Sequence, residues 1–407
     1  MLLSIKNGEI MEISAVIVGG LHHNTLGVIR SLGEEGIPKS NIRVLIVEEK
    51  YSNSNFLSKS KYLNKENIFN VSSYGEVSPW LEKNADIHKK SVVICCSDGS
   101  AEAVMASYDL LKDFYFTPSV KVNIHEFMSK EKQNELAIEA GFNIPASKVI
   151  CTNDIIDWDV FPCIIKPLTS VSGVKGDIRI LYNRTELESA LKETVSQNIQ
   201  IQEYIDKKME YQLIGCSLDD GNKVILPGYT DIIRQPEYTN TGYLRYSPIK
   251  GISFNSEAVS SFLKSLGYNG LFSIEFIRGK DENDYFLEIN MRNDGNAYCV
   301  KSAGVNLPFV WCYYQMFDSL PDLKLEFDTP VLFIPDWLDA RRGIQSAGIW
   351  GWIKQFYNAE SHAVFNRRDM GPFLFQTKEM VVFAGKCLSK KMIGMLGRKE
   401  KNEISFN

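Results

Sequence analysis

The chain has 407 residues, of which 44% are hydrophobic and 23% charged, and this composition is typical of a globular protein with two to three domains. Its formal net charge is −5 and it has no basic stripe, so nothing in the sequence supports nucleic-acid binding. No apolar run reaches the roughly 18 residues of a membrane span, and eight scattered cysteines without a CxxC pair indicate a reducing, cytoplasmic setting.

The first patterned segment is a buried strand, residues 12–20, that runs into a glycine turn. It begins just after Met11, a second candidate start, and nothing before it resembles a signal peptide. A helix over 25–32 and a strand over 42–47 ending at Glu48 follow, in the order typical of α/β nucleotide-binding folds. The turn does not match GxGxxG, which disfavours a dinucleotide site.

A further strand over 91–96 and a helix over 101–111 complete a doubly wound α/β domain, which we place at residues 1–120. His22 and His23 come where the first strand ends, the edge at which open sheets bind ligands. An ordinary surface loop is the simpler explanation for both histidines.

Ser129 is the expected N-cap of a helix that ends near Gly141. Farther on, an apolar strand ends in Lys166 and is followed by the Ser/Gly loop 170–176. A lysine beside such a loop suits phosphate, because the lysine supplies charge and the loop supplies backbone N–H donors. It is not a Walker P-loop, since GxxxxGK[ST] is absent, and a plain hairpin with an edge lysine remains an alternative.

The middle of the chain alternates between helical and strand-like segments. The expected elements are a helix over 185–194 with Thr185 as N-cap, strands over 199–206, 207–216 and 223–233, a helix over 257–267, and two strands over 271–277 and 285–289 joined by a polar hairpin loop.

The last of these strands delivers Glu288, Asn290 and Arg292 at alternate positions, which lie on one face of an extended strand. Glu288 and Asn290 offer the hard oxygen ligands that Mg²⁺ takes beside phosphate oxygens. Arg292 offers a cationic fork for a phosphoryl group, and Glu275 on the preceding strand adds a second carboxylate. Taken alone, the stretch is equally compatible with a strand end that carries solvated polar side chains.

In their order, these segments resemble the ATP-grasp superfamily over about residues 10–318, and most of all its carboxylate–amine ligase branch, near the carbamoyl-phosphate synthetase large subunit and D-aspartate ligase type enzymes. The segments that carry the resemblance are Ser129–Lys130 with Ala137–Gly141, Cys163–Pro167, Gln202–Ile205, Glu210–Tyr211, Glu288–Arg292 and Ala303–Pro308. The resemblance implies an ATP-grasp domain of α+β character over 121–318, with a small lid subdomain at about 148–204 and a large subdomain after it.

The resemblance also implies a role for each matching residue, and it favours Lys130 over Lys132 by the eleven-residue distance to Gly141. ATP binding is assigned to Lys130, Lys166, the loop residues Ser172 and Gly173, the hinge residues Glu203, Tyr204 and Ile205, and the ribose-binding Glu210. Binding of Mg²⁺, or alternatively Mn²⁺, is assigned to Glu275, Glu288 and Asn290. Arg292 is expected to stabilise the transferring phosphoryl group. The chain departs from the family at Met291, where proline is usual, and at Asn293–Asp294, which bears on the acceptor pocket.

The function implied is an ATP-dependent ligase that activates a small carboxylate as an acyl phosphate and joins it to an amine, releasing ADP and phosphate. The expected partners are these two small molecules, without nucleic acid or membrane, and a homodimer is left open. One alternative is carboxy-phosphate or carbamoyl-phosphate chemistry, although synthetases of that kind carry two ATP-grasp units. A non-catalytic nucleotide-binding protein is the other, which the intact Glu288, Asn290 and Arg292 disfavour.

Residues 319–407 are expected to form an extension that packs on the ATP-grasp domain. Within it, Asn366–Pro372 contains an Arg-Asp-x-x-Pro pattern that resembles a closing segment of polysaccharide-cluster and carboxylate–amine members. Four arginines are candidates for binding an anionic substrate, with a surface or ion-pair role as the simpler explanation for each: Arg234, Arg245, Arg341 and Arg342.

Overall fold

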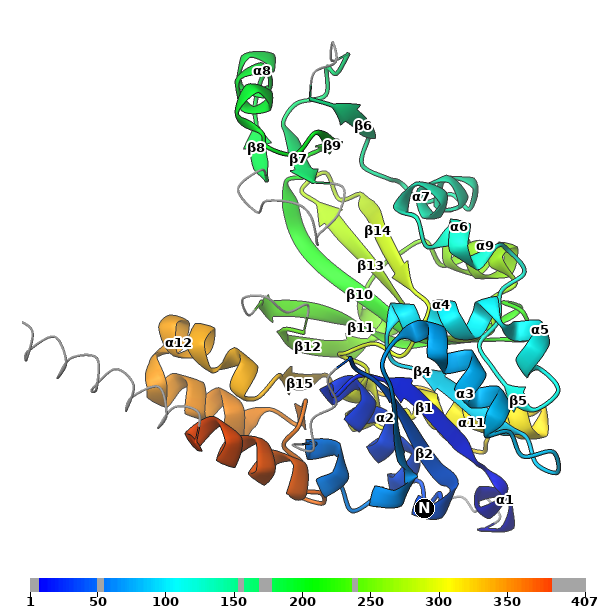
Figure 1. Ribbon diagram of the computed structural model, residues 1–407. Coiled ribbons are helices and arrows are strands. Elements are labelled where there is room, and N and C mark those ends of the chain that lie inside the picture. The colour runs from blue at the N-terminus through cyan, green and yellow to red at the C-terminus, as the bar shows by residue number, and fades with distance from the viewer. Residues whose placement is uncertain (1–6, 50–54, 153–156, 168–177, 236–240, 383–407) are drawn as a thin grey trace, which may run out of the picture. The chain divides into compact units, whose positions relative to one another are not determined.

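The computed structural model describes residues 7–49, 55–152, 157–167, 178–235 and 241–382. Its elements are shown in Figure 1. The chain forms two compact units. The first unit comprises residues 1–118, 233–246 and 292–407, and the second comprises residues 119–232 and 247–291.

The first unit contains a five-stranded parallel sheet in the order β3-β2-β1-β4-β5. Its strands are β1 (Ala15–Gly19), β2 (Ile42–Val47), β3 (Ile68–Val71), β4 (Ser91–Cys95) and β5 (Tyr115–Phe116), and the helices of this region are α1 (Asn7–Glu12), α2 (His23–Glu34), α3 (Val77–Lys83), α4 (Asp98–Ala106) and α5 (Tyr108–Leu111). The strand order reverses between β1 and β4, as in a doubly wound fold. The predicted α/β class is therefore confirmed for this region.

The remainder of the first unit contains a smaller group of strands and helices. These are β12 (Tyr243–Pro248, of which the last two residues belong to the second unit), α10 (Tyr298–Ser302), α11 (Leu307–Phe317), β15 (Val331–Ile334), α12 (Trp337–Asn358) and β16 (Ser361–His362). Both α10 and α11 contact α2, and β15 pairs with β12 and β16. Gly348 interrupts α12 with a φ of 70°, a conformation that glycine adopts without steric cost.

A buried ion pair holds the C-terminal segment against α2. Arg30 Nε donates to Asp369 Oδ2 at 2.9 Å, and the two side chains are 0% and 1% exposed. The same carboxylate accepts from Ser60 Oγ and the Lys61 N–H. Asp369 is the aspartate of the Arg-Asp-x-x-Pro pattern, so this pattern has a structural role. The described part of the extension, residues 319–382, lies in the first unit, where its strand β15 pairs with β12, a strand inside the domain predicted at 121–318.

Replacing Asp369 by asparagine should destabilise the first unit by about 3–5 kcal/mol, because the buried Arg30 charge would lose its counter-charge. Urea unfolding of the full chain measures this. The matched control is Asp109→Asn, whose partner Lys112 and carboxylate are both largely exposed, and it should change stability by less than about 1 kcal/mol. Equal effects of the two substitutions would refute the anchoring role of Asp369.

The second unit contains two antiparallel sheets. The larger one, which has the longer strands, contributes β14-β13-β10-β11 to this unit in that order, and the smaller one has the order β6-β9-β7-β8. The elements of the unit are α6 (Ile124–Phe127), α7 (Lys130–Glu139), β6 (Ser147–Cys151), β7 (Cys163–Pro167), β8 (Arg179–Leu181), α8 (Arg184–Glu193), β9 (Asn198–Glu203), β10 (Lys207–Leu218), β11 (Lys223–Arg234), α9 (Ser256–Leu266), β13 (Gly270–Gly279) and β14 (Asp284–Asn290). We call the smaller sheet together with α8 the lid.

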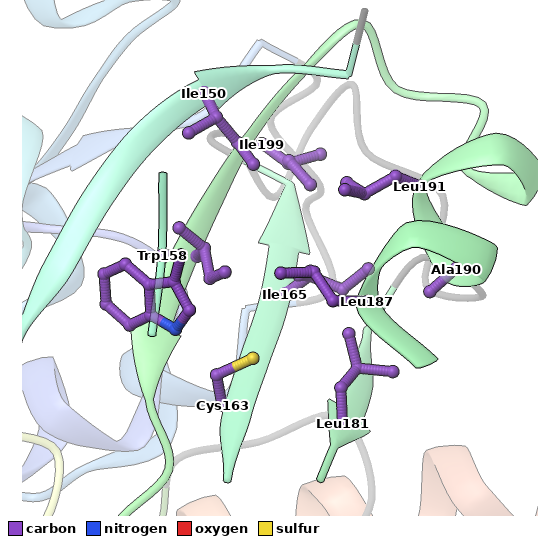
Figure 2. Close-up of a cluster of buried hydrophobic side chains, with 10 residues drawn as sticks. Ile150, Trp158, Cys163, Ile165, Leu181, Leu187, Ala190, Leu191 and Ile199 are labelled. Carbon is purple, nitrogen blue, oxygen red and sulfur yellow. The ribbon is translucent and has the colours of Figure 1, made fainter. Parts of the chain in front are cut away.

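One face of the lid sheet packs against α8 in a compact apolar core (Figure 2). Cys163 and Ile165 on β7 lie in this core with Leu187 of α8. Successive side chains of a strand alternate between faces. The next residue of β7, Lys166, therefore leaves from the face opposite α8.

The helix starts are set by local capping. Ser129 accepts a hydrogen bond from the Lys132 N–H, which confirms it as the N-cap of α7. The predicted N-cap of α8, Thr185, is wrong. Asn183 accepts from the Glu186 N–H instead, and the Glu186 carboxylate accepts from the Tyr182 N–H. Asparagine caps a helix better than threonine does, so it moves the start two residues upstream.

None of the helices in the described ranges combines the length and the apolar character that crossing a membrane requires.

Candidate active site

Two carboxylates face each other across neighbouring strands of the larger sheet. Glu275 on β13 is the register partner of Glu288 on β14, and Ser273 is the partner of Asn290. Residues directly opposite in an antiparallel pair lie on the same face, where two like charges repel each other. The pair is therefore suited to a cation between its oxygens, with the Asn290 amide beside it.

Hydrogen bonds from two amides hold Glu275, one member of this acidic pair, in place. Gln212 Nε2 on β10 donates to Glu275 Oε1 at 3.2 Å, and Asn290 Nδ2 donates to the same oxygen at 3.3 Å. In the described part of the chain, no group of three or more His, Cys, Asp or Glu side chains could hold a metal. Two carboxylates and one amide oxygen are an incomplete set for Mg²⁺, which fits an ion that also takes substrate phosphates and water.

Lys130 at the start of α7 approaches this acidic pair. Its Nζ lies 3.3 Å from Glu288 Oε2. The helix is fastened to β14 by Gln133, whose side-chain oxygen accepts from the Ile289 N–H. Lys132 instead pairs with Glu135 on the exposed side of the helix. The preference for Lys130 over Lys132 thus has a geometric basis.

Lys166 extends from the lid towards the same place. Its Nζ donates to Gln202 Oε1 on β9 at 2.8 Å. Burial, and then the nearby Lys130 cation, lower the pKa of Lys166 to about 8, while Glu288 acts in the opposite direction. Two cations and two carboxylates therefore gather on one side of the second unit. The repulsion between the two cations, and between the two carboxylates, costs electrostatic free energy unless a ligand that carries both kinds of charge binds beside them.

The strand β10 adds Glu210 to this face. Glu210 and Gln212 alternate on β10, so both leave from the face on which Gln212 meets Glu275. The Glu210 carboxylate pairs with Lys207 Nζ at 2.7 Å and is partly exposed. It remains accessible to a ligand hydroxyl.

The connection between β9 and β10 contains Glu203, Tyr204 and Ile205. The Glu203 N–H donates to the Ala146 carbonyl, and the Tyr204 N–H donates to the Pro162 carbonyl. The Glu203 carboxylate accepts from the Ala146 N–H, so this side chain braces the lid. The Ile205 N–H forms no backbone hydrogen bond to another described residue. The predicted loop residues Ser172 and Gly173 lie outside the described residues.

Arg292 belongs to the first unit, whereas the groups above belong to the second. Its guanidinium takes two bonds to Asp98, the shorter being 2.8 Å from Nε, and one of 3.3 Å to Asp294. Burial lowers the pKa of Arg292, but the Asp294 and Asp98 carboxylates outweigh this and raise it. No sequence pattern indicated the Asp98 contact, because the two residues are 194 positions apart.

The two histidines after β1 have structural partners. His22 Nδ1 accepts from the Asn24 N–H and caps α2, and His23 Nε2 lies 3.2 Å from Thr241 Oγ1. Burial lowers the pKa of both, well below the usual value for His23. Among the other candidates, Arg234 forms two hydrogen bonds with Asp339, which is the ion-pair role.

Comparison with solved structures identifies the architecture. An N5-carboxyaminoimidazole ribonucleotide synthetase solved as an ADP complex gives a TM-score of 0.58 at 12% identity, with 82% of this chain and 84% of that chain covered. An L-amino acid ligase from Bacillus licheniformis gives 0.52 at 13% identity, with 75% of each chain covered. The chain has the ATP-grasp fold. The predicted fold is therefore confirmed.

Two curated proteins are similar in sequence to this ATP-grasp chain. It is 21% identical to a D-aspartate ligase from Enterococcus faecium over 262 residues, which are 56% of this chain and 59% of that protein. It is 25% identical to a carbamoyl phosphate synthase large chain from Sulfolobus acidocaldarius over 195 residues, 44% of this chain and 18% of that protein. The chain thus spans less than two thirds of the length of either relative. No protein-family profile matches it.

Proposed function

We propose that the protein is an ATP-dependent ligase that activates a small carboxylate as an acyl phosphate and joins it to an amine, releasing ADP and phosphate. The observation that carries the proposal is the gathering of Lys130 and Lys166 beside Glu288 and its partner Glu275. A magnesium nucleotide carries charges that complement both groups, because its phosphates pair with the lysines and its cation pairs with the carboxylates. The sequence likeness to a D-aspartate ligase supports the same class.

In this proposal the second unit binds the nucleotide. The Ile205 N–H binds adenine, Glu210 binds the ribose hydroxyls, and Lys130 and Lys166 bind phosphate oxygens. Glu275, Glu288 and Asn290 hold Mg²⁺, which supplies positive charge to the phosphate oxygens when bound; Mn²⁺ accepts the same oxygen ligands. Arg292 stabilises the transferring phosphoryl group.

The chemistry follows from the poor reactivity of a carboxylate, whose leaving group would be oxide. Attack of a carboxylate oxygen on the γ-phosphorus of ATP breaks the bond to ADP and forms an acyl phosphate. The amine then attacks the acyl carbon, phosphate leaves with the oxygen that made the attack, and the amine loses a proton. Positioning and cationic charge stabilise the phosphoryl transfer, and no nucleophilic side chain is required.

The sequence likeness to a carbamoyl phosphate synthase large chain supports a second candidate chemistry. With bicarbonate as the carboxylate, the first step gives carboxy-phosphate. ADP release measured against a panel of amino acids, sugar acids and amines, with bicarbonate as a separate arm, distinguishes the two. Release that needs both a carboxylic acid and an amine supports the ligase, and release with bicarbonate alone supports the second chemistry. AMP and pyrophosphate as products would refute both.

Lys166 gives a prediction with two measurements. Lys166→Met should weaken ATP binding by about 1–3 kcal/mol, the scale of losing a charged hydrogen bond. Without a ligand, Lys166 has a pKa of about 8 and is therefore largely uncharged at pH 8.5. Bound phosphate favours the charged lysine, so the protein should take up protons when ATP binds at pH 8.5. The affinity should therefore weaken as the pH rises from 7 to 9. Calorimetry in buffers of different ionisation enthalpy measures the uptake, which Lys166→Met should remove.

The matched control is Lys132→Met, which removes an exposed lysine of α7 that pairs with Glu135. It should leave both the affinity and the proton uptake unchanged. An unchanged affinity in Lys166→Met would support the plain hairpin with an edge lysine instead.

A further inference from the structure

A cavity of about 580 Å³ lies within the first unit, and none of the residues assigned to the nucleotide lines it. It is open to solvent on one side and is lined by the last residue of α2, by α10, by the end of α12, and by β16 with the segment that follows it. Small-molecule sites in proteins usually measure roughly 300–1,000 Å³. The cavity is therefore large enough for a ligand, and the proposed ligase chemistry leaves it without a role.

The acidic part of the lining is already satisfied by the protein. Glu34 accepts from Tyr298 Oη at 3.0 Å and from Asn366 Nδ2 at 3.1 Å. Lys301 Nζ lies 3.8 Å from Glu34 and 2.8 Å from Glu35. Because these partners balance the Glu34 charge, the side of the cavity lined by Glu34 does not require a bound cation.

His362 supplies one fixed polar group. Its Nδ1 lies 3.0 Å from Asp336 Oδ1, and the other Asp336 oxygen accepts from the Val364 and Phe365 N–H groups. A carboxylate only accepts, so Nδ1 carries the proton. Nε2 makes no hydrogen bond to a described residue, and His362 lines the cavity. In the neutral ring Nε2 is therefore a hydrogen-bond acceptor for a group inside the cavity.

Two neighbouring arginines supply charge at the rim. Arg367 and Arg368 both line the cavity and are exposed. Neither guanidinium forms a hydrogen bond or ion pair within the described ranges, whereas Arg234 and Arg278 in the same chain are each paired with a carboxylate. Guanidinium groups bind carboxylates in a two-point geometry. The rim therefore favours an anionic group.

The remaining wall is aromatic. Phe356 and Phe365 lie with their ring centroids 5.5 Å apart and both line the cavity, as does Tyr357, which is 72% exposed. Exposed aromatic faces next to a cavity favour a ligand with an apolar or ring-bearing body. The lining thus offers three kinds of contact: an anion site, a fixed acceptor and an apolar surface.

We propose that this cavity binds a small carboxylic acid that has an amino or hydroxyl group next to its carboxylate and an apolar or aromatic side chain. Arg367 and Arg368 bind the carboxylate, Nε2 of His362 accepts from the amino or hydroxyl group, and the Phe356–Phe365 wall holds the side chain. The site shares no lining residue with the proposed nucleotide site, so it binds its ligand without ATP or metal.

Three probes that differ in one substituent test the proposal: phenylalanine, phenyllactate and 3-phenylpropionate. Calorimetric titration of the full chain, without ATP or metal, should give saturable binding. Phenylalanine or phenyllactate should bind at least fivefold more tightly than 3-phenylpropionate, which lacks the donor. The double variant Arg367→Ala/Arg368→Ala should bind at least tenfold more weakly, and its exposed positions should leave the fold intact. His362→Phe should abolish the preference for the donor-bearing probes.

The control is Arg341→Ala/Arg342→Ala, a second pair of adjacent exposed arginines in the same unit, outside the cavity lining. It should bind as the unmodified chain does, and so should Glu288→Gln. Absence of saturable binding by all three probes would overturn the proposal. Binding that Arg367→Ala/Arg368→Ala retains, or that Glu288→Gln loses, would also overturn it by placing the ligand elsewhere.

Discussion

Replacing Glu288 by glutamine should lower the rate of ADP formation by two to three orders of magnitude while the protein stays folded. The expected loss is of the size seen when one electrostatic contact to a transition state is removed. The fold should not suffer, because the neutral amide would no longer repel Glu275 across the strand pair. The ion pair with Lys130 that is lost is partly exposed and contributes little to stability. The midpoint of thermal unfolding without ligands should therefore stay the same or rise.

The matched control is Glu135→Gln, which removes a carboxylate of α7 that pairs with Lys132 at an exposed position. It should leave both the rate and the unfolding midpoint unchanged. Normal ADP production by Glu288→Gln would remove Glu288 from the catalytic set. A lower midpoint together with lost activity would instead mean that Glu288 has a structural role.

Arg292→Ala should reduce turnover by two to three orders of magnitude with little change in ATP affinity. Charge builds on the phosphoryl oxygens during transfer, so a group that stabilises it affects the rate more than binding. The same change should also cost stability, about 3 kcal/mol, because the nearly buried Asp294 loses a positively charged partner. Activity per folded molecule is therefore the quantity to compare, with chemical unfolding measured on the same samples.

Arg292→Lys separates the two effects. Lysine keeps a positive charge near Asp98 and Asp294 but loses the fork that bonds Asp98 at two points. A structural role predicts that lysine restores both stability and turnover. The transition-state role predicts that stability recovers while turnover stays at least tenfold low. ATP affinity that falls in parallel with turnover in Arg292→Ala would contradict the transition-state role.

The strand alternation predicted much of the site from sequence. Glu288 and Asn290 alternate on one strand, and their common face could be predicted without a structure. The register between strands could not, because it depends on how β13 and β14 pair and on the bulge between Glu275 and Phe276. The direct opposition of Glu275 and Glu288 is for this reason a result of the structure.

Contacts between segments that are distant in the chain could not be predicted from the sequence. The contribution of Gln212 was missed, although its place two residues after Glu210 on an alternating strand was a usable signal. The lowered pKa of Lys166 depends on its burial and on Lys130, which lies 36 residues earlier. Arg30 and Asp369 lie far apart in the sequence, and no local pattern around Asp369 predicts Arg30 as its partner.

The central claim, activation of a carboxylate as an acyl phosphate, is tested most directly by oxygen transfer. With ¹⁸O in the carboxylate of a substrate found by the ADP-release panel, one labelled oxygen should appear in inorganic phosphate for each product formed. Mass spectrometry of the released phosphate measures this, and the Glu288→Gln protein supplies the background. Label in phosphate at one atom per turnover is the predicted result. Unlabelled phosphate alongside full product formation, or label in AMP, would contradict the account.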